Sequence, residues 1–164
     1  MPTDVIFSYT TIHRVQKNGG LVFYVPALPH ASRLYVIRHT LANNFPFYIG
    51  TANNINHRFE ERLRAVREFG FRNNEINNIS IAIVQITVGG VPRPPHNNGI
   101  SAGIDVENLL IRSYMQQGHG VRNIAKVAPF LNNSGQTIRC YFYNTANWAH
   151  FVPANHNVPN NTFY

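Results

Sequence analysis

The stretch RLYVIRHTLANNFPFYIGT, residues 33–51, has the pattern of a β-hairpin. Its two ends, residues 33–40 and 45–51, are rich in aromatic and β-branched residues, which favour strands. The segment between them ends in two asparagines, which tolerate the left-handed backbone of a tight turn. Pro46 cannot donate a hydrogen bond to a β-ladder, so the second strand is expected to begin at or just after it. The pattern therefore predicts a pair of hairpin-connected strands.

Helical spacing follows this hairpin. Apolar residues at positions 55, 59, 63 and 66 fall on one face of a helix that would run from an asparagine cap at 53 or 54 to near residue 70. A second helix is predicted over residues 103–117, ending at Gly118. Its inward candidates are Ile104, Leu110, Ile111 and Tyr114. A short third helix is expected within residues 121–131.

Further strands are predicted before and after the helices. Residues 79–88, ISIAIVQITV, are rich in β-branched residues and predict a strand buried on much of both faces. Residues 4–15 and 21–28 flank the turn signal KNGG and predict an N-terminal hairpin. Residues 137–144, TIRCYFYN, predict another strand.

Two segments are predicted to be irregular. GGVPRPPHNNG, residues 89–99, contains three prolines and three glycines, so it is expected to be an exposed loop rather than a helix or a central strand. The tail from Pro153 is rich in turn residues and is expected to be an irregular wrap or partly mobile.

The composition limits the class of protein. The 164 residues suffice for one domain with its own core, and a 44% hydrophobic share is too high for intrinsic disorder. Lys and Arg number 14 against 7 Asp and Glu, a net charge of +7. All the cations except Lys17 and Lys126 are arginine, which favours a phosphate-bearing partner.

Cys140 is the only cysteine, which excludes an intramolecular disulfide and a cysteine-based zinc cluster. Because the sequence has neither a bilayer-length apolar stretch nor a signal-peptide pattern, we expect a cytoplasmic location and no membrane role.

Four residues of the predicted elements form a spaced set. Tyr35 lies on the first strand of the hairpin, Tyr48 opens the Tyr-Ile-Gly of the second strand, and Arg58 follows that glycine by eight residues on the predicted helix. Glu107 precedes Leu-Leu-Ile on the later helix. Over residues 33–123, this set and the order of its strands and helices resemble the GIY-YIG nuclease family. The sequence departs from the family pattern at Arg33-Leu34, where relatives have Gly-Ile, and at Arg62, where relatives often have histidine.

The resemblance implies a small domain of the α/β (α+β) class, with a mainly antiparallel central sheet flanked by helices. The chain would be a single domain over residues 1–164. Its nuclease-like core would span residues 33–123, preceded by an N-terminal hairpin extension in residues 1–32. Residues 124–164 would form a C-terminal extension that contains the additional strand.

The resemblance also implies an endonuclease that hydrolyses DNA phosphodiester bonds and depends on Mg²⁺ or Mn²⁺. Tyr35 would accept the proton of the attacking water, Tyr48 would orient the water or the phosphate, and Arg58 would hold the phosphate. Glu107 would bind the metal, and Asn123 would support the site. The residue types suit these roles, because Mg²⁺ is bound by one or two carboxylates and arginine offers phosphate a bidentate fork.

Each of these residues also has a structural alternative. The tyrosines could be cross-strand packing residues, Arg58 a solvated helix residue, and Glu107 a first-turn carboxylate favoured by the helix dipole. Further nucleic-acid contacts are predicted at basic or polar positions, namely Arg38, His57, Arg62, Arg93 and Asn123. The eight histidines show no recurrent metal-ligand spacing.

Several biological roles are compatible with a stand-alone nuclease of this kind. A restriction-type enzyme would be expected to form a homodimer for a palindromic site and to have a cognate methyltransferase. An interbacterial toxin would be delivered into a target cell and have an immunity protein, and a mobile-element nuclease is a third role. From a different class, the alternative is a non-catalytic basic module that binds nucleic acid. Glu107 distinguishes the two classes, because only the enzyme requires it.

Overall fold

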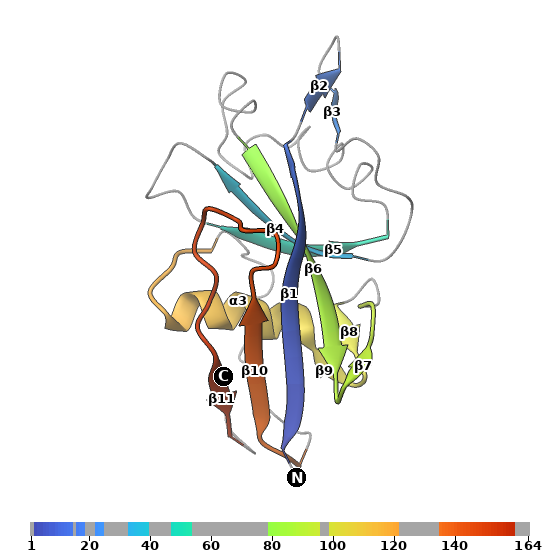
Figure 1. Cartoon of the computed structure of the whole chain (residues 1–164), viewed down its shortest axis with the longest axis vertical. Helices are drawn as coiled ribbons and strands as arrows, with labels where there is room; N and C mark the ends of the chain where they lie inside the picture. Colours follow the sequence, from blue (N-terminus) through green and yellow to red (C-terminus); the bar gives the residue numbers. More distant parts are fainter. Residues whose placement is uncertain are drawn as a thin grey trace.

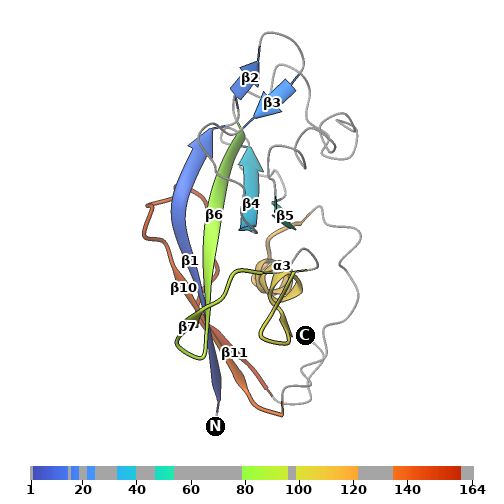
Figure 2. The same ribbon diagram turned by 90° about the vertical axis from the view of Figure 1, so that its right-hand side faces the viewer.

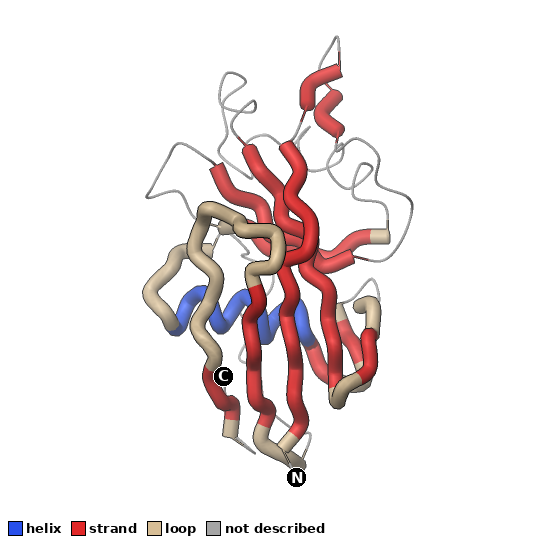
Figure 3. The backbone as a smooth tube through the Cα atoms, in the orientation of Figure 1, coloured by secondary structure: helices blue, strands red, loops and turns tan. Residues whose placement is uncertain are grey.

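The computed structural model describes residues 2–14, 16–18, 22–24, 33–39, 47–53, 79–95, 99–121 and 135–159. This part of the chain is a mixed α/β structure in which a large sheet forms most of the core and one helix packs against it (Figures 1 and 3). The strands of that sheet are β1 (Thr3–Arg14), β4 (Arg33–His39), β5 (Tyr48–Ala52), β6 (Ile79–Val88), β7 (Val91–Pro92), β10 (Ile138–Tyr143) and β11 (His156–Val158).

The sheet is mainly antiparallel, as predicted. Within the described residues its strand order is β11-β10-β1-β6-β4-β5, and β7 pairs with the end of β6. β1 and β10 run parallel to each other, and the other neighbours are antiparallel. The strands predicted in the middle of the chain, β4, β5 and β6, are therefore adjacent in space (Figure 1).

The β4–β5 hairpin has the predicted form. Tyr35 lies opposite Gly50, and Ile37 lies opposite Tyr48. β5 begins at Tyr48, two residues after Pro46, which is consistent with the inability of proline to donate to the ladder. β4 is covered on its other edge by β6, so it is an interior strand of the sheet.

β6 coincides with the predicted strand and is buried on both faces, as predicted. Ile81 and Ile83 point to one face, and Ala82 and Val84 point to the other; all four are at most 4% exposed. From Gln85 onward only one face stays buried, because Gln85 is exposed and Thr87 is half-buried, whereas Ile86 and Val88 are in the core.

The N-terminal region is only partly as predicted. Two short strands, β2 (Gln16–Asn18) and β3 (Val22–Tyr24), pair antiparallel, and β2 contains the first two residues of the KNGG signal. β1, however, leaves this pair of strands and pairs with β6 and β10 in the main sheet. The reason is its apolar face, in which Val5, Phe7 and Tyr9 are completely buried. Pairing within a short hairpin would leave that face in water.

The C-terminal strand is confirmed, but the tail is more regular than predicted. β10 covers most of the predicted segment, and β11 pairs antiparallel with it. Val158 lies opposite Ile138, and both side chains are completely buried. Burial of this pair orders residues 156–158 as a short strand, whereas the described residues before them, 153–155, are irregular as predicted.

Helix α3 (Val106–Gln116) packs against one face of the sheet (Figure 2). It is shorter than predicted, because β8 (Ile100–Ser101) and β9 (Ile104–Asp105) form a small hairpin before it. Asp105 caps the helix by accepting a hydrogen bond from the Asn108 backbone N–H at 3.0 Å. Its predicted inward residues are buried. The helix predicted from a cap at 53 or 54 to near residue 70 lies outside the described residues except for Asn53, and of the segment 121–131 only Val121 is described.

The proline-rich segment is not exposed throughout. Residues 91–94 are exposed as predicted, but Pro95 and Gly99 are buried. Within the described part of the chain, no helix has both the length and the apolar character that a membrane span requires.

Candidate active site

Tyr35 and Tyr48 come together on one face of the sheet. Tyr48 lies opposite Ile37, two residues from Tyr35, so the two tyrosine side chains emerge on the same face. Their ring centroids are 6.5 Å apart, with an interplanar angle of 26°. Tyr35 is 2% exposed, and Tyr48 is half-buried. The structure therefore brings together the two tyrosines that the sequence pattern singles out.

Gly50 makes room for the Tyr35 ring. A Cβ atom added at Gly50 would lie 2.5 Å from the Tyr35 hydroxyl oxygen and 2.7 Å from Cζ, which is closer than real side chains approach. The hydroxyl of Tyr35 consequently lies over β5, the last strand of the sheet in the described part of the chain. This close approach gives a physical reason for glycine in the Tyr-Ile-Gly motif of this chain.

Glu107 lies in the first turn of α3 and reaches the same strand. It is 7% exposed, and its Oε2 accepts a hydrogen bond of 2.7 Å from the Thr51 hydroxyl. Thr51 directly follows Gly50, so the carboxylate meets β5 one residue from the position over which Tyr35 lies. The contact with Thr51 is not apparent from the sequence, because nothing local links residue 51 to residue 107.

The end of the proline-rich segment packs tightly against Glu107. Gly99 has a φ of +82°, and a Cβ atom there would lie 2.6 Å from Glu107 Cβ and 2.9 Å from its Oε2. The Gly99 carbonyl also accepts hydrogen bonds from the backbone N–H groups of Val106 and Glu107, at 2.9 and 3.3 Å. Both the conformation and the space therefore require glycine at this position.

The oxygen donors around Glu107 suit a magnesium ion. Asp105 Oδ1 lies 3.5 Å from the position of the same added Cβ at Gly99, so a second carboxylate is close by. Glu107, with Asp105 or water, would provide the hard oxygen ligands that Mg²⁺ prefers. Within the described residues, no group of three or more His, Cys, Asp or Glu side chains is arranged to hold a metal. A Mg²⁺ ion held by Glu107 would keep several water ligands, as Mg²⁺ commonly does.

The tyrosines and Glu107 approach β5 from opposite faces. Thr51 lies opposite Leu34, whose side chain is in the core on the α3 face, whereas Gly50 lies opposite Tyr35 on the other face. The structure therefore brings these residues to consecutive positions of one strand but not to one surface. A ligand that contacts both must pass around the edge of β5.

Arg38 is in the core rather than on an exposed rim. It is 6% exposed, and its guanidinium lies 4.7 Å from the centroid of the Phe47 ring. Burial lowers the pKa of Arg38, and the nearby Tyr114 phenol opposes that shift. Since β4 alternates between two covered faces, an arginine that was predicted as a surface phosphate contact becomes a packing partner of aromatic rings.

Arg93 is exposed on a well-supported loop. Its backbone N–H donates to the Ile86 carbonyl at 2.9 Å, and the Ser101 hydroxyl lies 3.1 Å from each of the Arg93 and Pro94 carbonyl oxygens. Its position is compatible with the predicted nucleic-acid contact. The remaining predicted site residues, Arg58, His57, Arg62 and Asn123, lie outside the described residues.

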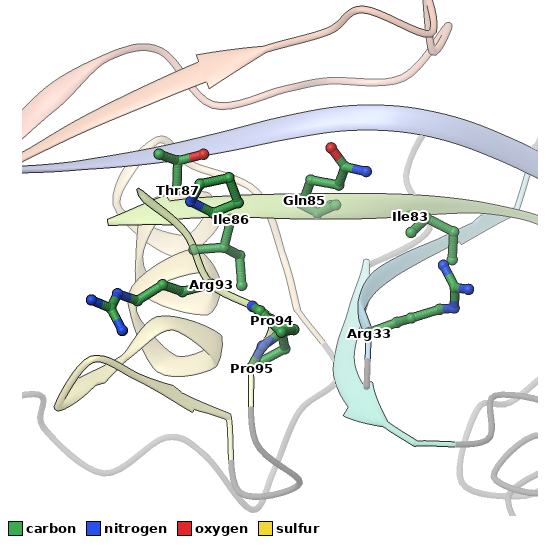
Figure 4. Close-up of a pocket in the computed structure, with 10 residues that line it drawn as sticks. Arg33, Ile83, Gln85, Ile86, Thr87, Arg93, Pro94 and Pro95 are labelled. Atoms are coloured by element: carbon green, nitrogen blue, oxygen red, sulfur yellow. The ribbon is translucent and has the colours of Figure 1, made fainter. Parts of the chain in front are cut away.

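Arg33 is a candidate that the sequence reasoning missed. It lies on β4 two residues before Tyr35 and therefore on the same face, and it lines a pocket of about 290 Å³ (Figure 4). The signal in the sequence is this spacing of two from Tyr35. Comparison with the nuclease family identifies Arg33 only as a replacement for the glycine of the Gly-Ile pair, not as a functional residue.

Searches of protein-family models, curated proteins and solved structures find no match to this chain, so the case for the site depends on its own residues and geometry.

Proposed function

We propose that the protein is a Mg²⁺-dependent endonuclease that hydrolyses phosphodiester bonds of DNA. The observation that carries the proposal is the convergence on β5: the Tyr35 hydroxyl lies over Gly50, and Glu107 is hydrogen-bonded to the next residue, Thr51. The β4–β5 hairpin and the helix α3, which is distant from it in the sequence, thus bring the proposed proton acceptor and the proposed metal ligand to opposite faces of one strand. The net charge of +7 favours a polyanionic substrate.

In this proposal each side chain has a separate role. Tyr35, in its phenolate form, takes the proton of the attacking water and becomes a neutral phenol, and Tyr48, whose ring is beside it, orients the water or the phosphate. Arg58 holds the phosphate through its bidentate fork. Bound at Glu107, Mg²⁺ would supply positive charge to the phosphoryl oxygens. Within the described residues β5 is the last strand of the sheet, and a nucleic-acid strand bound along it would reach both faces.

A specific observation favours the second candidate, a non-catalytic module that binds nucleic acid. Tyr35 and Glu107 emerge on opposite faces of the sheet. In a module of that kind, the exposed arginines and the half-buried Tyr48 would contact the nucleic acid, and Glu107 would serve only to join α3 to β5.

Plasmid cleavage tests the proposal. Wild-type protein should cut supercoiled DNA in Mg²⁺ or Mn²⁺ and not in EDTA, and Glu107→Gln should abolish cutting while DNA binding persists. The glutamine variant keeps an oxygen that can accept from Thr51. Asp4→Asn is the matched control, since it removes a carboxylate that pairs with Arg139 on β10, and it should cut like wild type. If wild type shifts DNA in a gel but cleaves it with neither ion, the binding module is correct.

The same gel addresses the biological role. Discrete fragments would indicate a restriction-type enzyme, for which sedimentation should then detect a homodimer. A smear would favour a degradative toxin, which would be neutralised by an immunity protein. A cognate methyltransferase is the partner to seek in the first case.

A further inference from the structure

A pocket opens where β4 and β7 separate along one edge of β6. The last β4–β6 pair at this end is Leu34 with Val84, and β7 pairs only with Thr87 and Val88. The pocket of about 290 Å³ lies between these two pairings (Figure 4). The described residues that line it are Arg33, Ile83, Val84, Gln85, Ile86, Thr87, Pro92, Arg93, Pro94 and Pro95.

The lining combines positive charge with apolar walls. Among the described lining residues there are two arginines and no carboxylate, together with the amide of Gln85 and the hydroxyl of Thr87. Figure 4 shows the Arg33 side chain extending from β4 toward Ile83 on β6, whereas Arg93 points away from Arg33. The Arg33 guanidinium lies beside Ile83 in this view, so Arg33 supplies positive charge at the Ile83 end of the lining. An anion bound here would meet no like charge from these residues.

The proline wall is fixed in place. The Ser101 hydroxyl contacts the carbonyls of Arg93 and Pro94, and Pro95 is buried. The Arg93 N–H bond to Ile86 connects the start of this wall to β6. A preformed wall reduces the entropy that a ligand must lose on binding, so the pocket is suited to a flat, partly apolar group.

The pocket adjoins Tyr35. Arg33 and Tyr35 point to the same face of β4 and are two positions apart, which corresponds to about 7 Å along a strand. Ile83 lines the pocket and is also the residue opposite Tyr35 on β6. A strand of nucleic acid whose scissile phosphate lies at Tyr35 would therefore place its neighbouring nucleotide at Arg33.

We propose that this cavity, the Arg33 pocket, binds the nucleotide next to the bond that is cut, with Arg33 on its phosphate and its base against Pro94, Pro95 and Gln85. The inference rests on the proposed nuclease function for the position of the scissile bond. Nucleotide binding in the Arg33 pocket does not require the nuclease function. A guanidinium beside an apolar pocket can bind a nucleotide whether or not cleavage follows.

Binding of a fluorescein-labelled single-stranded oligonucleotide, measured by anisotropy in EDTA, tests the pocket without cleavage. Arg33→Gln should weaken binding about 10-fold and lower the slope of log Kd against log salt by about 1, the loss of one phosphate contact. Arg33→Lys should restore the salt slope but not the full affinity, because lysine lacks the fork. Arg139→Gln is the control of equal charge on β10, and it should bind like wild type. Equal binding by the Arg33→Gln and Arg139→Gln variants would overturn the proposal.

Competition identifies what the pocket recognises. A deoxynucleoside 5′-monophosphate should displace the oligonucleotide from wild type at lower concentration than inorganic phosphate or the free nucleoside, and Gln85→Ala should reduce that advantage. Inorganic phosphate that competes as well as the nucleotide would contradict a base contact. The nuclease proposal fails separately: if wild type never cleaves but Arg33→Gln still loses affinity, the pocket stands and the catalytic assignment does not.

Discussion

Two pairs of tyrosines lie on opposite faces of the same sheet and have different surroundings. Tyr9 on β1 and Tyr114 on α3 are completely buried, and their hydroxyl oxygens are 2.7 Å apart. Tyr114 also donates to the Phe151 carbonyl at 3.0 Å. Tyr35, on the interior strand β4, and Tyr48, on β5, instead lie on the other face, near Gly50 and next to the Arg33 pocket. Residue type and burial alone do not distinguish a packing tyrosine from a candidate catalytic tyrosine. The distinction comes from the neighbouring groups, here Gly50 and the positively charged Arg33.

The surroundings of the first pair support a structural role. Burial raises the pKa of Tyr114 well above its ordinary value, and the adjacent Tyr9 raises it further. Burial likewise raises the pKa of Tyr9. A phenol held in its neutral form, with its hydrogen bonds satisfied in the core, is a poor proton acceptor. This difference can be tested by making the same substitution in each pair.

The largest effect is expected from removing one hydroxyl at each place. Tyr35→Phe should lower the rate of plasmid cleavage about 100-fold or more, the usual contribution of a general base, with little change in melting temperature. Tyr114→Phe should do the reverse: it should retain cleavage and lose about 1–3 kcal/mol of unfolding free energy, because the Phe151 carbonyl is left without its buried donor. Steady-state cleavage and urea denaturation measure the two quantities.

A control and a contrary outcome complete this test. Tyr143→Phe removes a hydroxyl from a tyrosine that is 47% exposed on β10, and it should change neither quantity. Full activity in Tyr35→Phe would remove Tyr35 as the base and reduce Tyr35 and Tyr48 to a second packing pair.

An intermediate effect is expected at Gly50. In Gly50→Ala the new methyl group must displace the Tyr35 ring, since the hydroxyl and Cζ leave no space for it. Overpacking of this kind costs about 1–3 kcal/mol of unfolding free energy, and the displaced hydroxyl should also reduce cleavage. Gly103→Ala is the control: the space around Gly103 is open, so any loss of stability there should come without loss of cleavage. A Gly50→Ala protein as active as wild type would show that the Tyr35 position is not needed.

The local parts of the fold could be predicted from the sequence. The β4–β5 pairing follows from strand-forming residues around a turn and from Pro46, and the buried face of α3 follows from helical spacing at Leu110, Ile111 and Tyr114. Both depend on residues close together in the chain. The resemblance to a nuclease family then singled out Tyr35 and Tyr48, which the structure places side by side.

The rest depends on pairings between distant residues. Local pattern cannot show that β1 lies between β6 and β10, because the same alternation suits a hairpin or an interior strand. For the same reason it could not place Arg38 in the core or Thr51 beside Glu107. The Arg33 pocket exists only because β4 and β7 separate along β6, which is a property of the assembled sheet.

The smallest effect is expected from pH, and it belongs to the α3 face. His156 stacks on Phe142, its Nε2 lies 3.3 Å from the Ser113 hydroxyl, and burial lowers its pKa from 6.5, although the Ala154 carbonyl opposes the shift. Between the lowered pKa and 6.5 the unfolded chain binds more protons than the folded one. The stabilising contribution of the neutral imidazole is therefore fully present above about pH 6.5, and the unfolding free energy decreases as the pH falls through this window.

His156→Gln should flatten that decrease in urea denaturation between pH 7 and 5. If the dependence of unfolding free energy on pH is unchanged, the effect belongs to other histidines, such as His119. The pKa of His119 is lowered mainly by burial and to a smaller extent by the charge of Arg38. Because these groups lie with Arg38 and Tyr114 rather than with Tyr35, the substitution should leave the pH profile of cleavage in place, and a shift of that profile would mean that the two faces of the sheet are coupled.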